Sequence, residues 1–203
     1  MAINYTIQAT IIDITVDTPK VGDVFLVDTN VWYWTTYPTA TYFASRQSSN
    51  YPAYLNKALA ARSHIHHSGL SLAELTHLIE KTEHEIYEKA VCPTKPKEYR
   101  HNITGERSRV ASEIQAAWGQ VTSLADPLTL TIDAQTTSAA LNRLQSARIG
   151  GYDHFLLESM KNNSIVQIIT DDGDFDTVSG IQVFTANRNV INSARNQGKL
   201  LKR

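Results

Sequence analysis

The sequence predicts an α/β protein, a three-layer α/β/α sandwich with a mainly parallel central sheet. Short, continuous apolar runs such as "VFLV" at 24–27 and "IVQII" at 165–169 are typical of strands that are buried on both faces. Helical stretches with apolar residues on one face alternate with these runs along the chain. Polar residues follow the apolar runs directly, as Asp28 follows Val27.

Composition narrows the class of protein. The chain has 203 residues, a formal net charge of -1 and a pI near 6.6, so any contact with nucleic acid must come from a local patch. One domain over 1–203 is the expectation for this length. The single cysteine, Cys92, cannot form an intrachain disulfide. No basic leader and no run of ~20 apolar residues is present, which predicts a cytoplasmic protein with no membrane contact.

The first third of the chain predicts strands, then a loop and a short helix. Residues 3–11 alternate between apolar and polar, which indicates a strand, and Ile12, Ile14 and Val16 continue in the opposite phase, which suggests a bulge. We therefore expect an added N-terminal strand segment over 1–22, before the buried strand at 24–27. The Thr- and Ser-rich stretch 35–50 predicts a loop or broken helix, and 53–61 a short helix.

The middle of the chain predicts two long helices. "HIHHSGL" at 64–70 is expected to be an extended link, and "SLAELTHLIEKTEHEIYEKA" at 71–90 a helix. The prolines of "CPTKPKEYRHN" end that helix, and "ERSRVASEIQAAWGQVTSLA" at 106–125 is a second one. The segment from about 84 to 127 is thus expected to be a helical insertion. Its second helix would bury Val110, Ile114, Trp118 and Val121.

The last third returns to alternating strands and helices. "PLTLTI" predicts a strand, 134–148 a helix that ends at Gly150-Gly151, and 152–161 another helix. "SIVQIIT" predicts a buried strand, "DDGDF" a turn, and "GIQVFTA" a strand, followed by a short helix with a basic tail.

Carboxylates follow the ends of the predicted strands. Asp28 ends the first buried strand, Glu74 lies in the first turn of a helix, and Asp153 opens another. Asp171, Asp172 and Asp174 follow "IIT". Such junctions lie at one edge of a parallel sheet. Two carboxylates ~4 Å apart repel by ~4 kcal/mol at an effective dielectric of ~20, so a cluster of them needs a cation. Oxygen ligands favour Mg²⁺ or Mn²⁺.

In this order, "VFLVDTNV", "SLAEL", "GGYDHFLLESM" and "IITDDGDF" resemble the acidic motifs of the PIN-domain nucleases, the family of VapC-type toxins. The resemblance covers roughly 23–187, apart from an inner stretch. It implies a PIN-like fold and a nuclease that cuts single-stranded RNA with Mg²⁺ or Mn²⁺. The resemblance makes Asp28, Glu74, Asp153 and Asp172 the catalytic, metal-holding acids, and makes Thr29, Asn30, Ser71, Thr170 and Asp174 the supporting or substrate-contacting residues. Asp171 is a weaker candidate than Asp172 for the fourth acid of the motif set.

The function expected is therefore a metal-dependent endoribonuclease, either the toxin of a toxin–antitoxin pair or an RNA-processing enzyme. Its expected partners are single-stranded RNA and an antitoxin or other inhibitor protein. The sequence leaves open whether the protein forms a homodimer. The alternative is a catalytically inactive module of the same fold that binds or regulates. A Mg²⁺-dependent phosphotransfer enzyme is a third hypothesis, although Asp28-Thr29-Asn30 lacks the second acid of a common phosphatase motif.

Several of these residues also have plain structural interpretations. Ser71-x-x-Glu74 matches a capping box, Asp153 can cap a helix, and Asp172 can be a turn residue. The histidines at 64, 66 and 67 lie on a strand and lack further ligands at zinc spacing. The aromatics at 32, 33, 34 and 37 could stack on bases or form core. The basic residues Arg100, His101, Arg107 and Arg109 could be a solvated face or an RNA-backbone patch.

Overall fold

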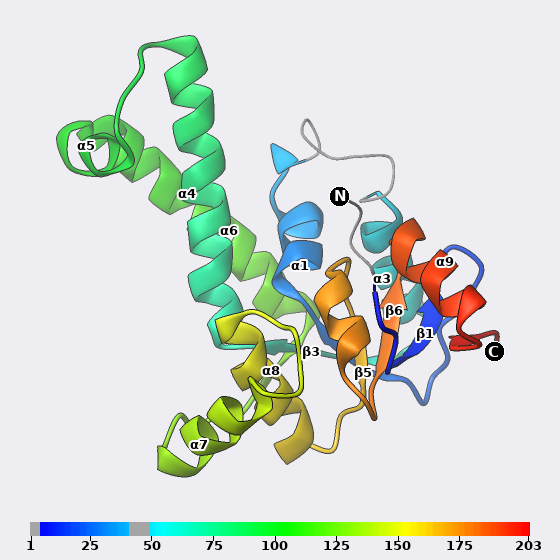
Figure 1. The fold of residues 1–203 in the computed structure, drawn as a ribbon. Coiled ribbons are helices and arrows are strands. Elements are labelled where there is room, and N and C mark those ends of the chain that lie inside the picture. Colours follow the sequence, from blue (N-terminus) through cyan, green and yellow to red (C-terminus); the bar gives the residue numbers. More distant parts are fainter. Residues whose placement is uncertain (1–4, 41–48) are drawn as a thin grey trace.

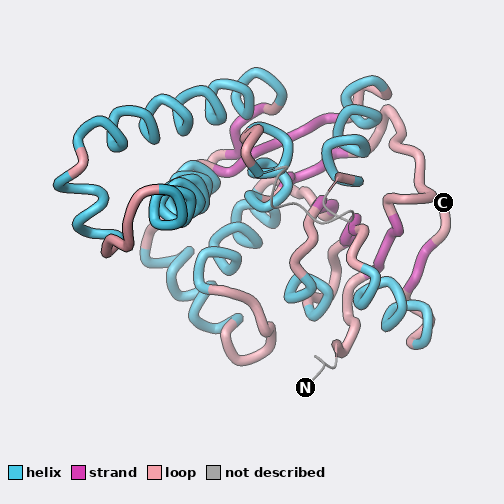
Figure 2. The backbone as a smooth tube through the Cα atoms, turned by 90° about the horizontal axis from the view of Figure 1, so that it is seen from above, coloured by secondary structure: helices cyan, strands magenta, loops and turns pink. Residues whose placement is uncertain are grey.

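The computed structural model has a central sheet of seven strands in the order β4-β3-β2-β5-β6-β1-β7, and every pair of neighbours is parallel. Residues 5–40 and 49–203 are described. Helices flank the sheet on both faces (Figures 1 and 2), so the expected α/β/α class is confirmed. The strands are β1 (Thr10–Asp13), β2 (Val24–Val27), β3 (His64–Ser68), β4 (Asp126–Leu128), β5 (Gln167–Ile169), β6 (Gln182–Thr185) and β7 (Leu200–Leu201).

Two apolar cores lie on opposite faces of the sheet. One is formed with α1, α3, α4 and α6, and the other with α8, α9 and the 3₁₀ helix η1. Within β2, Phe25 and Val27 enter the first core and Leu26 enters the second, which explains the unbroken apolar run. The helices are α1 (Thr29–Thr36), α3 (Asn50–Ala60), α4 (Leu70–Ala90), α5 (Pro96–Asn102), α6 (Thr104–Leu124), α7 (Ala134–Arg143), α8 (Gly151–Asn162), η1 (Gly173–Thr177) and α9 (Arg188–Asn196).

The sheet has a topological switch point between β2 and β5. The chain that leaves β2 continues to β3 on one side, whereas the chain that leaves β5 continues to β6 on the other side. The two strands pair directly, with Val27 opposite Ile169, and the backbone N–H of Asp28 continues the ladder by donating to the carbonyl of Ile169 at 3.0 Å. In open α/β sheets, ligands bind in the crevice beyond the carboxyl ends of the strands at such a point.

The N-terminal segment differs from its prediction. A strand covers only 10–13, and it joins the central sheet between β6 and β7 instead of forming a separate strand pair. The expected bulge is absent from this strand, because Ile11 and Ile12 are buried in different cores. The apparent change of phase therefore reflects burial on both faces. Residues 3 and 4 of the expected strand, and 41–48 of the expected loop, lie outside the described residues.

Helices α4, α5 and α6 form a helical arm that includes the segment expected to be an insertion. In Figure 1, α4 and α6 extend together away from the sheet, and α5 lies near their outer end. The side chain of Glu80 on α4 pairs with Arg100 at 3.0 Å and with Arg107. Arg109 pairs with buried Glu83 and with Glu106, at 2.6 Å in each case. These arginines therefore fasten α5 and α6 to α4. Because their charges are paired with carboxylates of the arm itself, the structure favours the solvated-face interpretation over an RNA-backbone patch.

Three further boundaries differ from the predictions. The segment 64–68, expected to be an extended link with its histidines on a strand, is the full strand β3, because its backbone pairs with both β2 and β4. The helix expected at 134–148 ends at Arg143, and Gly150 is the N-cap of α8. The strand expected from "PLTLTI" is limited to β4. Among the described residues, no helix is both long and apolar enough to cross a membrane.

Candidate metal and active site

Asp28 lies at the carboxyl end of β2 and caps the N-terminus of α1. Its side chain is only 5 % exposed. Oδ1 accepts from the backbone N–H of Thr29 at 2.7 Å. Oδ2 accepts from Asn30 Nδ2 at 2.7 Å and from Thr170 Oγ1 at 2.6 Å. Thr29, Asn30 and Thr170 therefore hold the carboxylate in one orientation, although hydrogen bonds alone do not remove the cost of burying its charge.

The hydroxyl of Thr170 links Asp28 to the second acidic segment. It donates to Asp28 and accepts from the backbone N–H of Asp172 at 2.9 Å. Asp172 Oδ1 in turn accepts from the backbone N–H of Asp174 at 2.9 Å, which starts η1. One oxygen of Asp172 therefore stabilises the turn, as expected of a turn residue. The 170–174 segment, called the acid loop below, is tied to the end of β2 by the hydroxyl of Thr170. It is also tied to the start of α1, because Asn30 Oδ1 accepts from the backbone N–H of Asp171 at 3.5 Å.

Glu74 is held from α1 and not by its own helix. Thr29 Oγ1 donates to Glu74 Oε2 at 2.5 Å. The predicted capping box is absent, because α4 begins after Gly69 without a side-chain cap and Ser71 Oγ has no hydrogen-bond partner among the described residues. Ser71 is buried with 1 % exposure and lies about one turn before Glu74 on α4. The bond from Thr29 brings the first turns of α1 and α4 together.

Asp153 lies in the first turn of α8, on a different segment of the chain from the other three acids. One oxygen, Oδ2, accepts from the backbone N–H of Gly150 at 3.1 Å, so the residue does help to cap its helix. A side chain at position 150 would meet this carboxylate, since an added Cβ would lie 2.9 Å from Oδ2. Gly150 therefore lets the carboxylate of Asp153 fold back over the helix terminus.

All pairs among Asp28, Glu74, Asp153 and Asp172 interact electrostatically. Burial, followed by the charges of Glu74 and Asp172, raises the pKa of Asp28 to about 7. Burial and then the charges of Asp28, Asp172 and Glu74 raise the pKa of Asp153 to about 8. Burial and the charge of Asp172 also raise the pKa of Glu74. The structure thus brings the acids of four separate segments into one region of mutual repulsion.

The donor set suits a hard divalent cation. Every candidate ligand is a carboxylate, the group preferred by Mg²⁺ and Mn²⁺. In the described part of the chain, no three His, Cys, Asp or Glu side chains stand at the spacing of a ready-made metal site. Mg²⁺ is usually held by one or two carboxylates and several waters, so a looser arrangement of acids still fits such an ion. A cation among them would lower the repulsion that raises the three pKa values.

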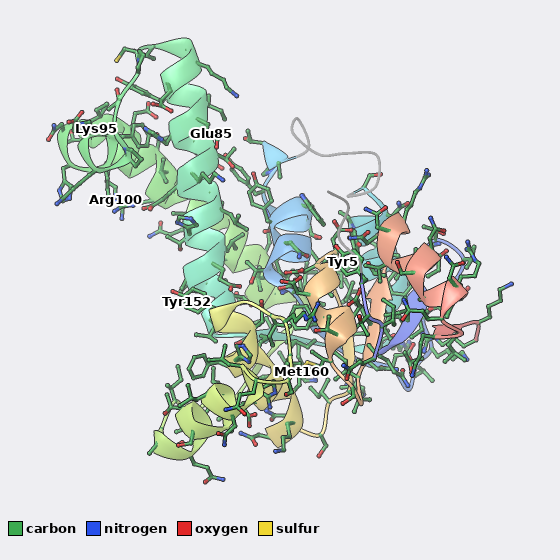
Figure 3. All side chains as sticks on the ribbon, viewed as in Figure 1. Tyr5, Glu85, Lys95, Arg100, Tyr152 and Met160 are labelled. Atoms are coloured by element: carbon green, nitrogen blue, oxygen red, sulfur yellow. The ribbon has the colours of Figure 1, made fainter. Side chains whose placement is uncertain are left out.

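Other candidates lie elsewhere. Trp32 is fully buried core, and Tyr37 is buried with its hydroxyl donating to Glu83, so these aromatics are not available to bases. His67 is buried against the ring of Trp118, with 4.9 Å between ring centroids, which supports the structural interpretation of the histidine strand. Figure 3 shows Lys95 and Arg100 near the outer end of the arm, well away from Tyr152, the exposed neighbour of Asp153.

Two features of the acid loop and η1 were not predicted. Asp171 Oδ1 accepts from the hydroxyl of Tyr51 on α3 at 2.5 Å. Asp176 is fully buried, and neither of its carboxyl oxygens has a hydrogen-bond partner in the described residues. Tyr51 and Asp171 are 120 positions apart, and Asp176 is one of several acids in a short polar run. No pattern in the sequence distinguishes either residue from core or turn.

Asp176 should make the protein less stable as the pH rises. Burial, with the charges of Asp174 and Asp172, raises its pKa to about 7, above the ~3.9 of an unfolded chain. The folded state therefore binds more protons between these values, so this stability is present below about pH 4 and is lost as the pH rises through about 7. In EDTA, Asp176→Asn should raise the free energy of unfolding by about 1–3 kcal/mol at pH 8, and by less at pH 5.

Denaturant unfolding of both proteins at the two pH values measures this difference. Asp133→Asn is the control, because Asp133 is an exposed helix cap whose side chain accepts from the backbone N–H of Thr136 at 2.8 Å. An Asp176→Asn protein that is less stable than wild type at pH 8 would contradict the prediction.

The sequence matches no protein-family model and no curated protein. Among solved structures, it is similar to VapBC2 from Rickettsia felis bound to a promoter DNA fragment, with 13% identity, a TM-score of 0.46, and 79% of this chain and 96% of that chain covered. It is also similar to FitAcB from Neisseria gonorrhoeae, with 16% identity, a TM-score of 0.42 and coverage of 81% and 99%. FitAB bound to an IR36 DNA fragment aligns with 15% identity, a TM-score of 0.41 and coverage of 81% and 96%.

Proposed function

We propose that this protein is a metal-dependent endoribonuclease that hydrolyses phosphodiester bonds of single-stranded RNA, with Mg²⁺ or Mn²⁺ as its ion. The observation that carries the proposal is the mutual repulsion of Asp28, Glu74, Asp153 and Asp172 at the switch point of the sheet. A fold gains nothing from gathering carboxylates that raise one another's pKa, so a cationic ligand is the simplest reason for them. RNA as the substrate follows the motif resemblance.

The roles follow from the contacts. Asp28, Glu74, Asp153 and Asp172 would hold the ion, directly or through water. When bound, the ion would acidify a water molecule and stabilise charge on the phosphoryl oxygens. Thr170 and Asn30 orient Asp28, and Thr29 orients Glu74. Asp174, whose backbone N–H binds Asp172, supports the acid loop. No side-chain nucleophile is needed, which separates this proposal from an aspartyl-phosphate mechanism.

Two exposed arginines next to the site could meet substrate phosphates. Arg148 precedes Gly150, and its backbone N–H donates to Thr177 of η1 at 3.3 Å. Arg188 starts α9, directly after Asn187, whose side chain donates to the carbonyl of Asp171 at 2.9 Å. Neither guanidinium has an ion-pair partner among the described residues, whereas the arginines of the arm are paired. Exposed cations on the segments that contact η1 and the acid loop suit a polyanion whose phosphates extend past the ion.

The inactive module remains the second candidate, favoured by the lack of three preformed metal ligands in the described residues. An inhibitor protein as partner, which the resemblance implies for a toxin, belongs to the first proposal.

Incubation of the protein with single-stranded RNA and with single-stranded DNA, in Mg²⁺, Mn²⁺ or EDTA, tests the proposal. We expect internal cleavage of RNA with either ion and none in EDTA, as seen by gel electrophoresis of end-labelled substrates. Cleavage of DNA alone would support the proposed hydrolase activity and overturn RNA as its substrate. Intact RNA and DNA with both ions, from a protein with a native circular dichroism spectrum, would favour the inactive module.

A further inference from the structure

Tyr51 lies beneath the acid loop, on the first turns of α3. Its side chain is fully buried, and its ring packs on Trp34 with 5.3 Å between centroids. Its hydroxyl donates to Asp171 Oδ1 at 2.5 Å and accepts from the backbone N–H of Ala186 at 2.9 Å. The hydroxyl of Thr185 lies 3.0 Å away. Tyr51 thus connects α3, the end of β6 and the acid loop through one oxygen atom.

The acid loop is held from two sides. On the Asp28 side, Thr170 accepts from the backbone N–H of Asp172. On the opposite side, Asp171 binds Tyr51 through its carboxylate and Asn187 through its carbonyl, at 2.5 Å and 2.9 Å. The peptide unit between Asp171 and Asp172 is therefore hydrogen-bonded at both its carbonyl and its N–H group. Movement of Asp171 would carry the Asp172 carboxylate with it.

We propose that Tyr51 is a positioning residue: it anchors Asp171 and thereby sets the placement of Asp172, and with it the affinity of the acid cluster for a divalent cation. This inference rests on the proposed function, because it takes the acid cluster as the cation site. Residues that hold metal ligands in place without touching the metal commonly change its affinity by about 10–100-fold when they are replaced.

The hydroxyl stays a donor at every pH of interest. Burial, followed by the charge of Asp171, raises the pKa of Tyr51 above its ordinary value. The interaction with Asp171 is therefore a charge-assisted hydrogen bond, which is stronger than one between neutral groups. Phenylalanine would fill the same space and keep the ring contact with Trp34, but it would remove this bond and leave the N–H of Ala186 without its acceptor.

Tyr54 offers a matched control one turn further along α3. It is also buried, and its hydroxyl also donates to a carboxylate, Asp17 Oδ2, at 2.5 Å. Asp17 binds Arg203 and lies outside the acid loop. Tyr51→Phe and Tyr54→Phe therefore delete the same chemical group from the same helix. Both should lower the melting temperature, but only Tyr51→Phe should change cation binding.

The test measures Mn²⁺ dissociation constants by isothermal titration calorimetry, for wild type, Asp28→Asn, Tyr51→Phe and Tyr54→Phe. We expect Tyr51→Phe to weaken Mn²⁺ binding by about tenfold or more. Tyr54→Phe should stay within about twofold of wild type. In an Asp171→Ala background, adding Tyr51→Phe should cause little further loss, since both changes break the same bond. A role in stability alone would not produce this non-additivity.

The outcomes separate this inference from the proposed function. Equal Mn²⁺ binding by wild type and Tyr51→Phe, with weak binding by Asp28→Asn, would overturn the role of Tyr51 and leave the cation site in place. Equal weakening by Tyr54→Phe would also overturn it, because the effect would then reflect general loss of stability. Equal Mn²⁺ binding by wild type and Asp28→Asn would overturn the cation site and, with it, the role of Tyr51.

Discussion

Asp28→Asn should reduce metal-dependent RNA cleavage by more than about a hundredfold and leave the fold intact. Asn keeps an oxygen for the N–H of Thr29, so the cap of α1 persists. It removes the negative charge that interacts with the charges of Glu74, Asp153 and Asp172. It also removes a carboxylate oxygen that would bind the ion. The rate of cleavage of a labelled RNA, measured with saturating Mn²⁺, checks the expectation.

The same substitution should separate stability from function. Without an ion, the raised pKa of Asp28 means that its charge destabilises the fold as the pH rises through about 7. The variant places an amide nitrogen against the donors Asn30 Nδ2 and Thr170 Oγ1 and loses those two hydrogen bonds. Its stability relative to wild type should therefore be more favourable at about pH 8 than at about pH 5. With Mn²⁺, wild type should gain stability by ligand linkage, about 2.7 kcal/mol at a hundred times the dissociation constant. The variant should gain less. Thermal unfolding with EDTA and with Mn²⁺ measures both effects.

Asp13→Asn is the matched control for this experiment. Asp13 also ends a parallel strand, β1, and its Oδ1 accepts from the backbone N–H of Thr15 at 2.9 Å. It lies on the far side of β5 and β6 from β2 and contributes to none of the raised pKa values of the cluster. Its variant should cleave RNA at the rate of wild type. Normal cleavage by Asp28→Asn as well would remove Asp28 from the site.

Asp28 was predictable because turn chemistry does not require a charge directly after a strand that is apolar on both faces. The order of the strands then explains the rest of the site, because a parallel sheet places β2 and β5 side by side and their carboxyl ends at one edge. Glu74 was harder to interpret from sequence, since a capping box explained it equally well. In the structure, its carboxylate binds Thr29, 45 positions away, and α4 has no side-chain cap.

The errors have physical causes that a linear pattern does not show. Residues 10–13 looked like part of a strand with one wet face because polar residues alternate up to Thr10, but the sheet has helices on both sides. Glu83 on α4 is a further residue whose place the sequence does not indicate. It is buried because two groups distant in sequence, the hydroxyl of Tyr37 and the guanidinium of Arg109, satisfy its oxygens. Pairings of this kind depend on the packed fold and leave no local signature.

Arg203→Ala should lower the free energy of unfolding by about 3–5 kcal/mol, because it leaves two buried carboxylates without their cation. Nε and Nη2 donate to the two oxygens of Asp17, at 2.9 and 2.8 Å. Nη1 and Nη2 donate to the two oxygens of Asp23, at 2.5 and 2.8 Å. Asp17 is 6% exposed and Asp23 4% exposed. This double fork is matched to the planar guanidinium, so lysine should restore only part of the stability.

The loss should depend on pH in a defined direction. Burial alone would raise the pKa of Asp23, but the hydrogen bonds from Arg203, the Lys20 N–H and Gln167 outweigh it and hold the pKa below its usual value. The stability from this pair is therefore present above about pH 4 and is lost as the pH falls through the lower, folded pKa. In the variant, Asp23 would keep the burial that raises its pKa and lose the hydrogen bonds from Arg203 that lower it. The difference from wild type should thus be larger at about pH 8 than at about pH 5.

Denaturant unfolding at the two pH values measures the effect, and the melting temperature should fall by on the order of 10 °C at the higher pH. Arg195→Ala is the control, because the exposed Arg195 side chain binds, among the described residues, only Asn192 Oδ1 on its own helix, at 3.1 Å. Its loss should cost less than about 0.5 kcal/mol. Since Asp17 and Asp23 lie outside the acid cluster, Arg203→Ala should keep the Mn²⁺ affinity of wild type wherever it is folded. A loss no larger than that of Arg195→Ala would show that water replaces the guanidinium at little cost. The carboxylates would then be less buried in solution than their exposed fractions indicate.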